Sequence, residues 1–287
     1  MKELDFIEII NKRNNTDILG DDCAYLKEFG IVVSQDNFVE DVHFKREWAT
    51  PYQIGYKACA VNISDILASG GKPKYITVGL SLPSDIDEDF IKEFYRGIEA
   101  GLCGAKIVGG DITGGDKIFI SITAIGSAKG RKISSRKNAK EGYIVITCGE
   151  YGKSSLGLNE LLAGKKNTEN IKAHLEPKLN FSFSEQISTK INTNYAMMDT
   201  SDGLADALFR ISQASNVTIE ADFIEGIFGA EDYNLVACVP SDFLKEIKDY
   251  YVIGKVKKFE GYYLKIEDKK YSNYDELGLY DHFKGEF

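Results

Sequence analysis

The feature that most constrains this chain is a set of short acidic segments, widely spaced in the sequence, each beside a run typical of a β-strand. The set comprises Gly20-Asp21-Asp22, Ser34-Gln35-Asp36, Gly109-Gly110-Asp111 and Asp199-Thr200-Ser201-Asp202-Gly203. Two carboxylates about 4 Å apart repel each other by roughly 4 kcal/mol at an effective dielectric constant of ~20. Carboxylates without clustered His or Cys select hard cations such as Mg²⁺. The sequence therefore predicts that these segments meet in the fold and build one magnesium cluster.

Composition limits the class of protein. The chain has 287 residues, 43% of them hydrophobic, which suits a globular protein with one large or two smaller domains. Its net charge of −9 argues against nucleic-acid binding, and no apolar run approaches the ~20 residues of a membrane-spanning helix. Residues 1–5 lack signal-peptide character, and the five cysteines are scattered without a Cys-x-x-Cys pair. We therefore expect a cytoplasmic protein with neither a nucleic-acid nor a membrane partner.

Strand and helix patterns alternate in both halves of the chain, which predicts an α+β fold. Residues 23–26 and 31–33 are expected to pair as a hairpin. Asp22 would then open one strand, and the segment ending in Asp36 would close the other, so that the two acidic ends meet. A later strand is expected to break at Gly109.

The second half of the chain is expected to form its own domain. We divide the chain into residues 1–138 and 139–287, the second with a mixed sheet and helices. It opens with a strand over 142–148, followed by Gly149-Glu150-Tyr151-Gly152-Lys153-Ser154. That segment resembles the end of a phosphate-binding P-loop, but the first glycine of a true P-loop would fall at Thr147. A P-loop nucleotidase is therefore a minor alternative.

A helix is expected from Pro51, with Thr50 as its N-cap, to about Ser69. Asn62 and Asp65 are three residues apart and share one face of this helix. Asp65 is either a metal ligand that reaches the earlier acidic segments or an ordinary solvated charge.

A magnesium cluster of this size suits a highly charged reactant. Mg²⁺ is usually shared with substrate phosphates, and ATP carries a charge of about −4. If the acceptor is also a phosphate, several ions would offset the repulsion between the two anions. Such an acceptor is deprotonated near neutral pH and needs no general base, which fits a chain with only His43, His174 and His282.

The motifs occur in an order that resembles the thiamine-monophosphate kinases, within the aminoimidazole-ribonucleotide synthetase superfamily. The resemblance covers nearly the whole chain, and its strength lies in the ordered set. Its motifs are Gly20-Asp21-Asp22-Cys23-Ala24, Ser34-Gln35-Asp36, Val42-His43-Phe44, Gly55-Tyr56-Lys57-Ala58, Ala60-Val61-Asn62-Ile63-Ser64-Asp65, Gly109-Gly110-Asp111, Asp199-Thr200-Ser201-Asp202-Gly203-Leu204 and Glu231-Asp232-Tyr233.

The resemblance implies direct in-line transfer of the γ-phosphoryl group of ATP to thiamine monophosphate, giving thiamine diphosphate. It implies an N-terminal ATP- and Mg²⁺-binding domain that pairs with its twin in a homodimer through its sheet, and a C-terminal domain that completes the active site. The implied Mg²⁺ ligands are Asp22, Ser34, Gln35, Asp36, Asp65, Asp111, Asp199 and Asp202, of which Asp36, Asp65 and Asp202 are implied to be catalytic. The implied ATP contacts are Gly110, Asp111, Arg136, Ser201 and Tyr95. The implied contacts to thiamine monophosphate are His43, Glu231 and Tyr280.

The chain departs from the family pattern at four places. Gln35-Asp36-Asn37 replaces the usual Thr-Asp-Thr, and Ile112-Thr113-Gly114 replaces a Thr-Thr-Arg run, so a hydroxyl and a phosphate-directed arginine are missing. The segment between Asp222 and Gly229, which normally helps wall the thiamine pocket, is short. His174-Leu175-Glu176-Pro177 replaces His-Leu-Arg-Pro.

Two alternatives from different classes stay open. Another ATP-dependent enzyme of the superfamily, similar to aminoimidazole-ribonucleotide synthetase, would share the ATP and magnesium site. A non-catalytic acidic protein would use the same carboxylates for structural Ca²⁺, although they lack the twelve-residue loop spacing of Ca²⁺ hands. Release of ADP with thiamine monophosphate, and with no other acceptor, would separate these hypotheses.

Overall fold

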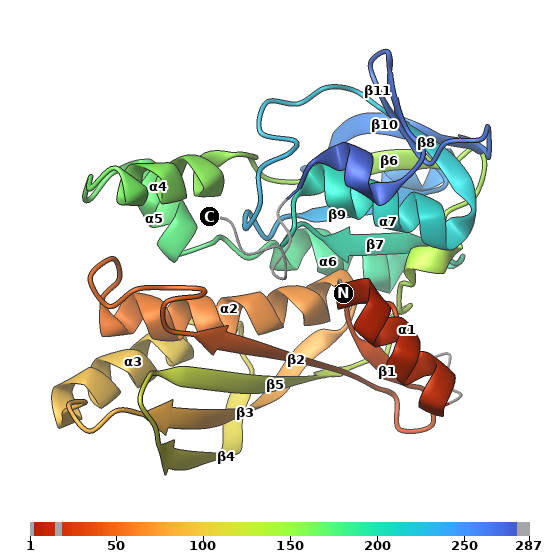
Figure 1. Cartoon of the computed structure of the whole chain (residues 1–287). Helices are drawn as coiled ribbons and strands as arrows, with labels where there is room; N and C mark the ends of the chain where they lie inside the picture. Colours follow the sequence, from red (N-terminus) through yellow and green to blue (C-terminus); the bar gives the residue numbers. More distant parts are fainter. Residues whose placement is uncertain (1–2, 15–18, 280–287) are drawn as a thin grey trace.

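The computed structural model describes residues 3–14 and 19–279. It contains two β-sheets with helices between and around them (Figure 1). The first sheet has the strand order β1-β2-β5-β3-β4, and all its neighbours are antiparallel except β3 and β4, which α3 connects. Its strands are β1 (Ala24–Leu26), β2 (Ile31–Val39), β3 (Lys72–Leu82), β4 (Lys106–Gly114) and β5 (Phe119–Ser127).

Helix α2 (Pro51–Ala68) lies at the centre of the molecule, between the first sheet and the second half of the chain (Figure 1). The predicted cap is confirmed, because Thr50 forms a capping box at its N-terminus. Residues on nearly all its sides are buried, as expected of a helix packed on both faces. It also approaches α3 (Glu88–Gly101) closely, since a Cβ at Gly55 would lie 2.0 Å from the carbonyl oxygen of Phe94.

The second sheet has the strand order β12-β11-β8-β10-β6-β9-β7 and is antiparallel except between β11 and β8. Its strands are β6 (Ile144–Thr147), β7 (Ala196–Asp199), β8 (Val217–Ala221), β9 (Leu235–Val239), β10 (Tyr251–Lys258), β11 (Leu264–Ile266) and β12 (Lys269–Tyr271). The remaining helices are α1 (Glu3–Asn14), α4 (Lys153–Leu162), α5 (Glu169–Leu175), α6 (Phe181–Lys190) and α7 (Leu204–Ser215), with 3₁₀ turns at Arg136–Asn138, Ser241–Glu246 and Tyr274–Leu277.

The two halves share a continuous apolar core. Val32 of the first sheet, Ile66 of α2 and Ile187 of α6 are fully buried members of one cluster. The α+β class with two mixed sheets is confirmed, while the boundary at residues 138/139 stays a prediction. No helix in the described part of the chain combines the length and apolarity needed to cross a membrane.

Two predicted strand ends were wrong. Strand β2 does not stop at Ser34 but continues through Asp36 to Val39, because β5 pairs with it along its whole length. Strand β4 likewise continues through Gly109 to Gly114, paired with β3. The glycines are needed for this pairing: a Cβ at Gly110 would lie 1.9 Å from the carbonyl oxygen of Val78.

Candidate metal and phosphate site

Three carboxylates from distant parts of the sequence converge beside α2. Asp22 precedes β1, Asp65 lies in the last turns of α2, and Asp199 ends β7. One carboxylate oxygen from each lies within 4.8 Å of the others. The structure therefore brings together the first, second and last of the predicted acidic regions.

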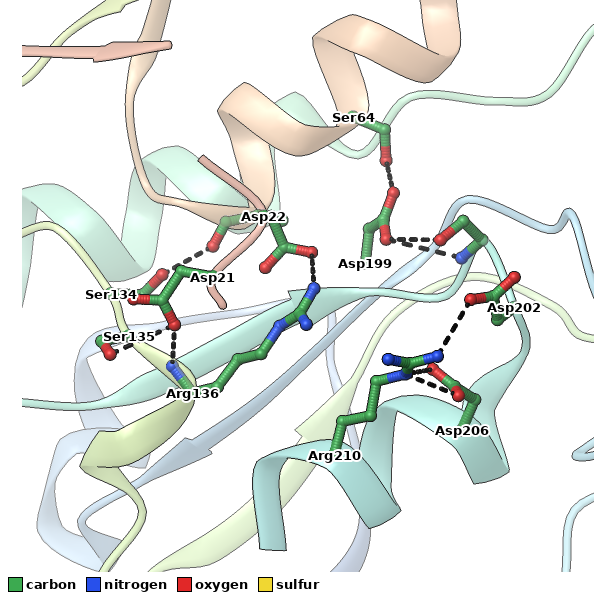
Figure 2. Close-up of polar contacts among 12 residues, drawn as sticks. Asp21, Asp22, Ser64, Ser134, Ser135, Arg136, Asp199, Asp202, Asp206 and Arg210 are labelled. Carbon is green, nitrogen blue, oxygen red and sulfur yellow. Dashed lines mark hydrogen bonds and ion pairs between the residues drawn. The ribbon is translucent and has the colours of Figure 1, made fainter. Parts of the chain in front are cut away.

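Asp199 is held by hydroxyl groups. Ser64 on α2 donates to its Oδ2 at 2.8 Å, and the hydroxyl of Ser201 donates to its Oδ1 at 3.0 Å (Figure 2). The residue is 1% exposed. Burial, and after it the charge of Asp22, raises the pKa of Asp199 to about 7.

The pKa values of the other two carboxyls are also raised. Burial, followed by the charges of Asp36, Asp199 and Asp22, raises the pKa of Asp65 well above its usual range. Burial raises the pKa of Asp22 in spite of the nearby Arg136. All three shifts express one cause: ionised carboxylates are crowded where water cannot screen them. A divalent cation with oxygen ligands fits this donor set, because it would remove the repulsion.

Two guanidinium groups border the carboxylates (Figure 2). Nη2 of Arg136 lies 3.0 Å from Asp22 Oδ1. Arg210 on α7 donates from Nε to both oxygens of the fully buried Asp206, at 2.7 and 2.8 Å, and its Nη2 lies 3.5 Å from Asp202. The arginines are close enough to interact: burial and Arg210 both lower the pKa of Arg136, although Asp22 more than restores it. Two cations beside one acidic cluster favour a ligand that carries phosphate groups.

Asp36 and Ser34 lie on the face of β2 that α2 covers. The backbone amide of Asp36 donates to Asn62 Oδ1 at 3.1 Å, and the hydroxyl of Ser34 donates to the Asn62 carbonyl oxygen at 3.3 Å. The charge of Asp36 acts on Asp65, as described above. The structure thus places both residues at the border of the carboxylate cluster.

The side chain of Gln35 points away from the cluster. Successive side chains of a strand point to opposite faces, so Gln35 lies on the face opposite Asp36. There it donates to Ser121 Oγ at 3.4 Å and accepts from Thr123 Oγ1 at 3.2 Å. The structure therefore does not bring this side chain to the other predicted ligands.

Asp111 is also separated from the cluster within this chain. In the register of the sheet, Asp36 faces Ile122, Ile122 faces Val78, and Val78 faces Gly110. Since neighbouring strands are about 4.8 Å apart, the backbone of Asp111 lies roughly 14 Å from that of Asp36. Asp111 is exposed on the edge strand β4. Its predicted roles stay predictions that a single chain does not satisfy.

The other predicted nucleotide contacts lie in different places. Ser201 joins the cluster through Asp199, and its carbonyl oxygen accepts the backbone amide of Glu231 at 2.7 Å. Gly110 lies beside Asp111 on the edge strand. Tyr95 is on α3, where its ring packs edge-on against Phe94 with centroids 5.4 Å apart. The contacts described for Tyr95 belong to the apolar core rather than to the acidic cluster.

The predicted acceptor contacts His43 and Glu231 lie near each other. His43 Nδ1 accepts the backbone amide of Val39 at 3.1 Å, which leaves the proton of a neutral imidazole on Nε2. Burial tends to raise the pKa of Glu231, but Lys57, His174 and His43 together hold it below its usual range. Tyr280 lies outside the described residues.

The segment that resembles a P-loop is closed by a side chain of the protein. Asp232 accepts the backbone amides of Gly152 at 2.8 Å and Ser154 at 3.2 Å, at the start of α4. These are the amides that would cradle a phosphate in a P-loop. The P-loop hypothesis was therefore wrong, because an aspartate already occupies the anion position.

Sequence reasoning missed three participants in this region. Ser64 and Lys57 lie within quoted motifs, but only the packing of α2 shows what they contact. Arg210 carried a local signal, since its i, i+4 spacing from Asp206 predicts an ion pair on a helix. Helix α5 was also missed, and with it the buried position of His174, which was expected in a loop.

The fold and the site define a protein of the AIR synthase related class. The family described as "AIR synthase related protein, N-terminal domain" matches residues 20–128. The chain is 36% identical to the thiamine-monophosphate kinase of Bacillus subtilis, over 84% of this chain and 85% of that protein. It is 30% identical to the thiamine-monophosphate kinase of Aquifex aeolicus, over 95% of this chain and 98% of that protein. The chain belongs to the thiamine-monophosphate kinase family.

Solved structures agree with this assignment. A structure described as "AaThiL complexed with AMPPCP and TMP" has a TM-score of 0.88 and 29% sequence identity, covering 98% of this chain and 97% of that one. The Aquifex aeolicus thiamine monophosphate kinase has a TM-score of 0.83 and 30% identity, covering 94% and 98%. The hydrogenase maturation protein HypE, at 20% identity and a TM-score of 0.66, covers 85% and 86% and shares the fold.

Proposed function

We propose that this chain transfers the γ-phosphoryl group of ATP to thiamine monophosphate by direct in-line attack, giving thiamine diphosphate, at a magnesium site built from Asp22, Asp65 and Asp199. The observation that carries the proposal is the convergence of these three carboxylates within 4.8 Å beside two arginines. Membership of the thiamine-monophosphate kinase family identifies the acceptor.

The residues of the chain would divide the work between two anions. The carboxylates of Asp22, Asp65, Asp199 and, at their border, Asp36 would hold Mg²⁺, which when bound would bridge phosphate oxygens and offset their charge. Arg136 and Arg210 would orient the phosphates of ATP by charge-assisted hydrogen bonds. Ser201 and Ser64 keep the Asp199 carboxylate in place. The acceptor phosphate needs no base to remove a proton, in agreement with a cluster that contains none.

We further propose that two copies of the chain pair through their first sheets. Helices α2 and α3 cover one face of that sheet, and no described element covers the other (Figure 1). Large apolar side chains are exposed on that face or on the β4 edge: Tyr25, Tyr75, Val108, Ile112 and Phe119. In such a pair Asp111 and Gly110 would be available to the partner copy. A cytoplasmic location fits the five free cysteines.

Coupled measurement of ADP release tests the proposed reaction. Thiamine monophosphate should support turnover at millimolar Mg²⁺, while thiamine and aminoimidazole precursors should not. Turnover with an aminoimidazole precursor would instead favour the related synthetase, and binding of Ca²⁺ without any turnover would favour a non-catalytic protein.

A further inference from the structure

A second buried polar cluster lies on α2, away from the carboxylates. Lys57 is 2% exposed, and its Nζ lies 3.4 Å from Glu231 Oε1 and 3.3 Å from His174 Nε2. His174 Nδ1 lies 3.4 Å from Glu231 Oε2 and 3.0 Å from Ser154 Oγ. Four segments of the chain thus meet here: α2, the start of α4, α5 and the loop before β9. We call these four residues the lysine cluster.

The contacts fix the proton positions in the lysine cluster. An ammonium group can only donate, so His174 Nε2 must accept from Lys57, and the imidazole proton lies on Nδ1. That proton faces Glu231 and Ser154. Burial and the charge of Lys57 lower the pKa of His174 to about 4, so the ring is neutral at physiological pH. The cluster is therefore one ammonium, one neutral imidazole and one carboxylate, and it needs no outside ion.

Glu231 is the only member of the lysine cluster that reaches solvent to a substantial degree, with 27% of its side chain exposed against 2% for Lys57 and 4% for His174. A carboxylate has about four acceptor sites, and the two contacts above use two of them. Its backbone is fixed as well, since Glu231 has a φ of 63° and its amide is bonded to Ser201. Glu231 is thus a rigid acceptor whose remaining capacity faces outward.

The spacing along α2 relates the lysine cluster to the metal site. Ser64, which holds Asp199, is seven residues after Lys57, so the two lie on one face of the helix about 10 Å apart. A phosphate bound at the carboxylates would be repelled by Glu231. The other end of the same molecule would meet Glu231 only if it offered N–H donors or positive charge. Thiamine monophosphate has this polarity, with its phosphate at one end and an aminopyrimidine at the other.

We infer that Lys57 and His174 are positioning residues that hold Glu231 ready to accept hydrogen bonds from the amino-bearing heteroaromatic end of the phosphate acceptor. The inference rests on the proposed function and adds to it the part of the acceptor that is recognised and the residues that set its recognition. Neither Lys57 nor His174 touches the acceptor. Their effect passes through Glu231, so it must appear in acceptor binding and vanish when Glu231 is changed.

Steady-state kinetics with thiamine monophosphate and ATP varied in turn tests this inference. Lys57→Met should raise the KM for thiamine monophosphate by roughly tenfold or more, the cost of losing a charge-assisted hydrogen bond. It should leave the KM for ATP within about twofold. The double variant Lys57→Met with Glu231→Gln should be no worse than Glu231→Gln alone. Lys153→Met is the matched control, because Lys153 is exposed and pairs only with Glu150 among the ion pairs described for it.

Ser154→Ala provides a milder change if Lys57→Met folds poorly, since it removes only the hydroxyl beside His174 and keeps the backbone contact to Asp232. It should raise the same KM by a smaller factor. Equal changes in both KM values, or additive effects in the double variant, would overturn the inference while leaving the kinase activity in place. A wild-type protein that forms no thiamine diphosphate would overturn the proposed function, and this inference with it.

Discussion

The carboxylate cluster and the lysine cluster are both buried between α2 and the second half of the chain, but their charges are arranged in opposite ways. Asp22, Asp65 and Asp199 repel one another, and all three pKa values are raised. Lys57 and Glu231 offset each other around a neutral imidazole, and the pKa of Glu231 is lowered. The first arrangement is completed only by a cation from outside, whereas the second is complete in the protein.

This difference separates two kinds of functional polar site. A site of like charges costs stability until its ligand binds, because desolvated charges of one sign are unfavourable. A self-compensated site costs less and can keep one group in a fixed orientation for recognition. On this view the carboxylate cluster acts on the phosphates and the lysine cluster acts on the organic part of the acceptor. The four predictions below test that division, from the largest expected effect to the smallest.

Removing a charge from the carboxylate cluster should have the largest effect. Asp199→Asn or Asp65→Asn should lower kcat by a factor of about 10³ or more, because phosphoryl transfer depends on electrostatic stabilisation by the bound cations. The metal-free variants should nevertheless be at least as stable to heat as the wild type, since one repelling charge is gone. Near-native turnover by either variant would remove that residue from the metal site.

Arg210→Lys should have the next largest effect. Lysine keeps the charge but cannot make the paired contacts of a guanidinium, so we expect kcat to fall by roughly tenfold to a hundredfold. Arg46→Lys is a suitable control, because Arg46 makes a comparable ion pair with Glu40 on the first sheet. Equal, small losses in both variants would show that Arg210 serves the fold rather than the phosphates.

At the lysine cluster, Glu231→Gln should change binding more than chemistry. The amide keeps the shape but loses the charge, so the KM for thiamine monophosphate should rise about tenfold with little change in the KM for ATP. Initial rates at saturating ATP and at saturating acceptor separate the two constants. A fall in kcat with both KM values unchanged would move Glu231 from acceptor binding to the chemical step.

Metal removal should affect stability in a pH-dependent way. The pKa of Asp199 is about 7 in the folded protein, through burial and then Asp22, against roughly 4 in an unfolded chain. The folded state therefore binds more protons in this interval, and the Tm of the metal-free protein should fall as pH rises from about 4 to 7. Asp199→Asn should flatten that decline.

Added Mg²⁺ should raise the Tm by about 5 °C at pH 8, if it is present at a hundred times its dissociation constant. The increase should be smaller at pH 5, where protons compete for the carboxylates. An equal increase at both pH values would mean that the metal binds elsewhere.

The sequence predicted the parts of the fold and site that depend on local pattern. The Thr50-Pro51 start of α2 is a cap with its own chemistry, and the structure confirms it. The family resemblance is also confirmed, because it rested on an ordered set of motifs rather than on one. The convergence of Asp22, Asp65 and Asp199 followed from charge alone, since such a set of acidic segments needs a common purpose.

The remainder depends on pairing between distant strands, which local pattern does not contain. A glycine pair looks like a strand end, yet Gly110 is there because β3 approaches closely. Gln35 and Asp36 are neighbours in the motif, but the two-residue period of β2 sends their side chains to opposite faces. Lys57 looked like a solvated charge in the middle of a helix. Only the position of α5 shows that it is buried against His174.

The most direct test of the account is the formation of thiamine diphosphate from ATP and thiamine monophosphate as free Mg²⁺ is varied, in the wild type and in Asp199→Asn. The account predicts product only in the presence of Mg²⁺ and a loss of at least about 10³-fold in the variant at every Mg²⁺ concentration. Product formed at the wild-type rate by Asp199→Asn, or by the wild type in excess chelator, would contradict it.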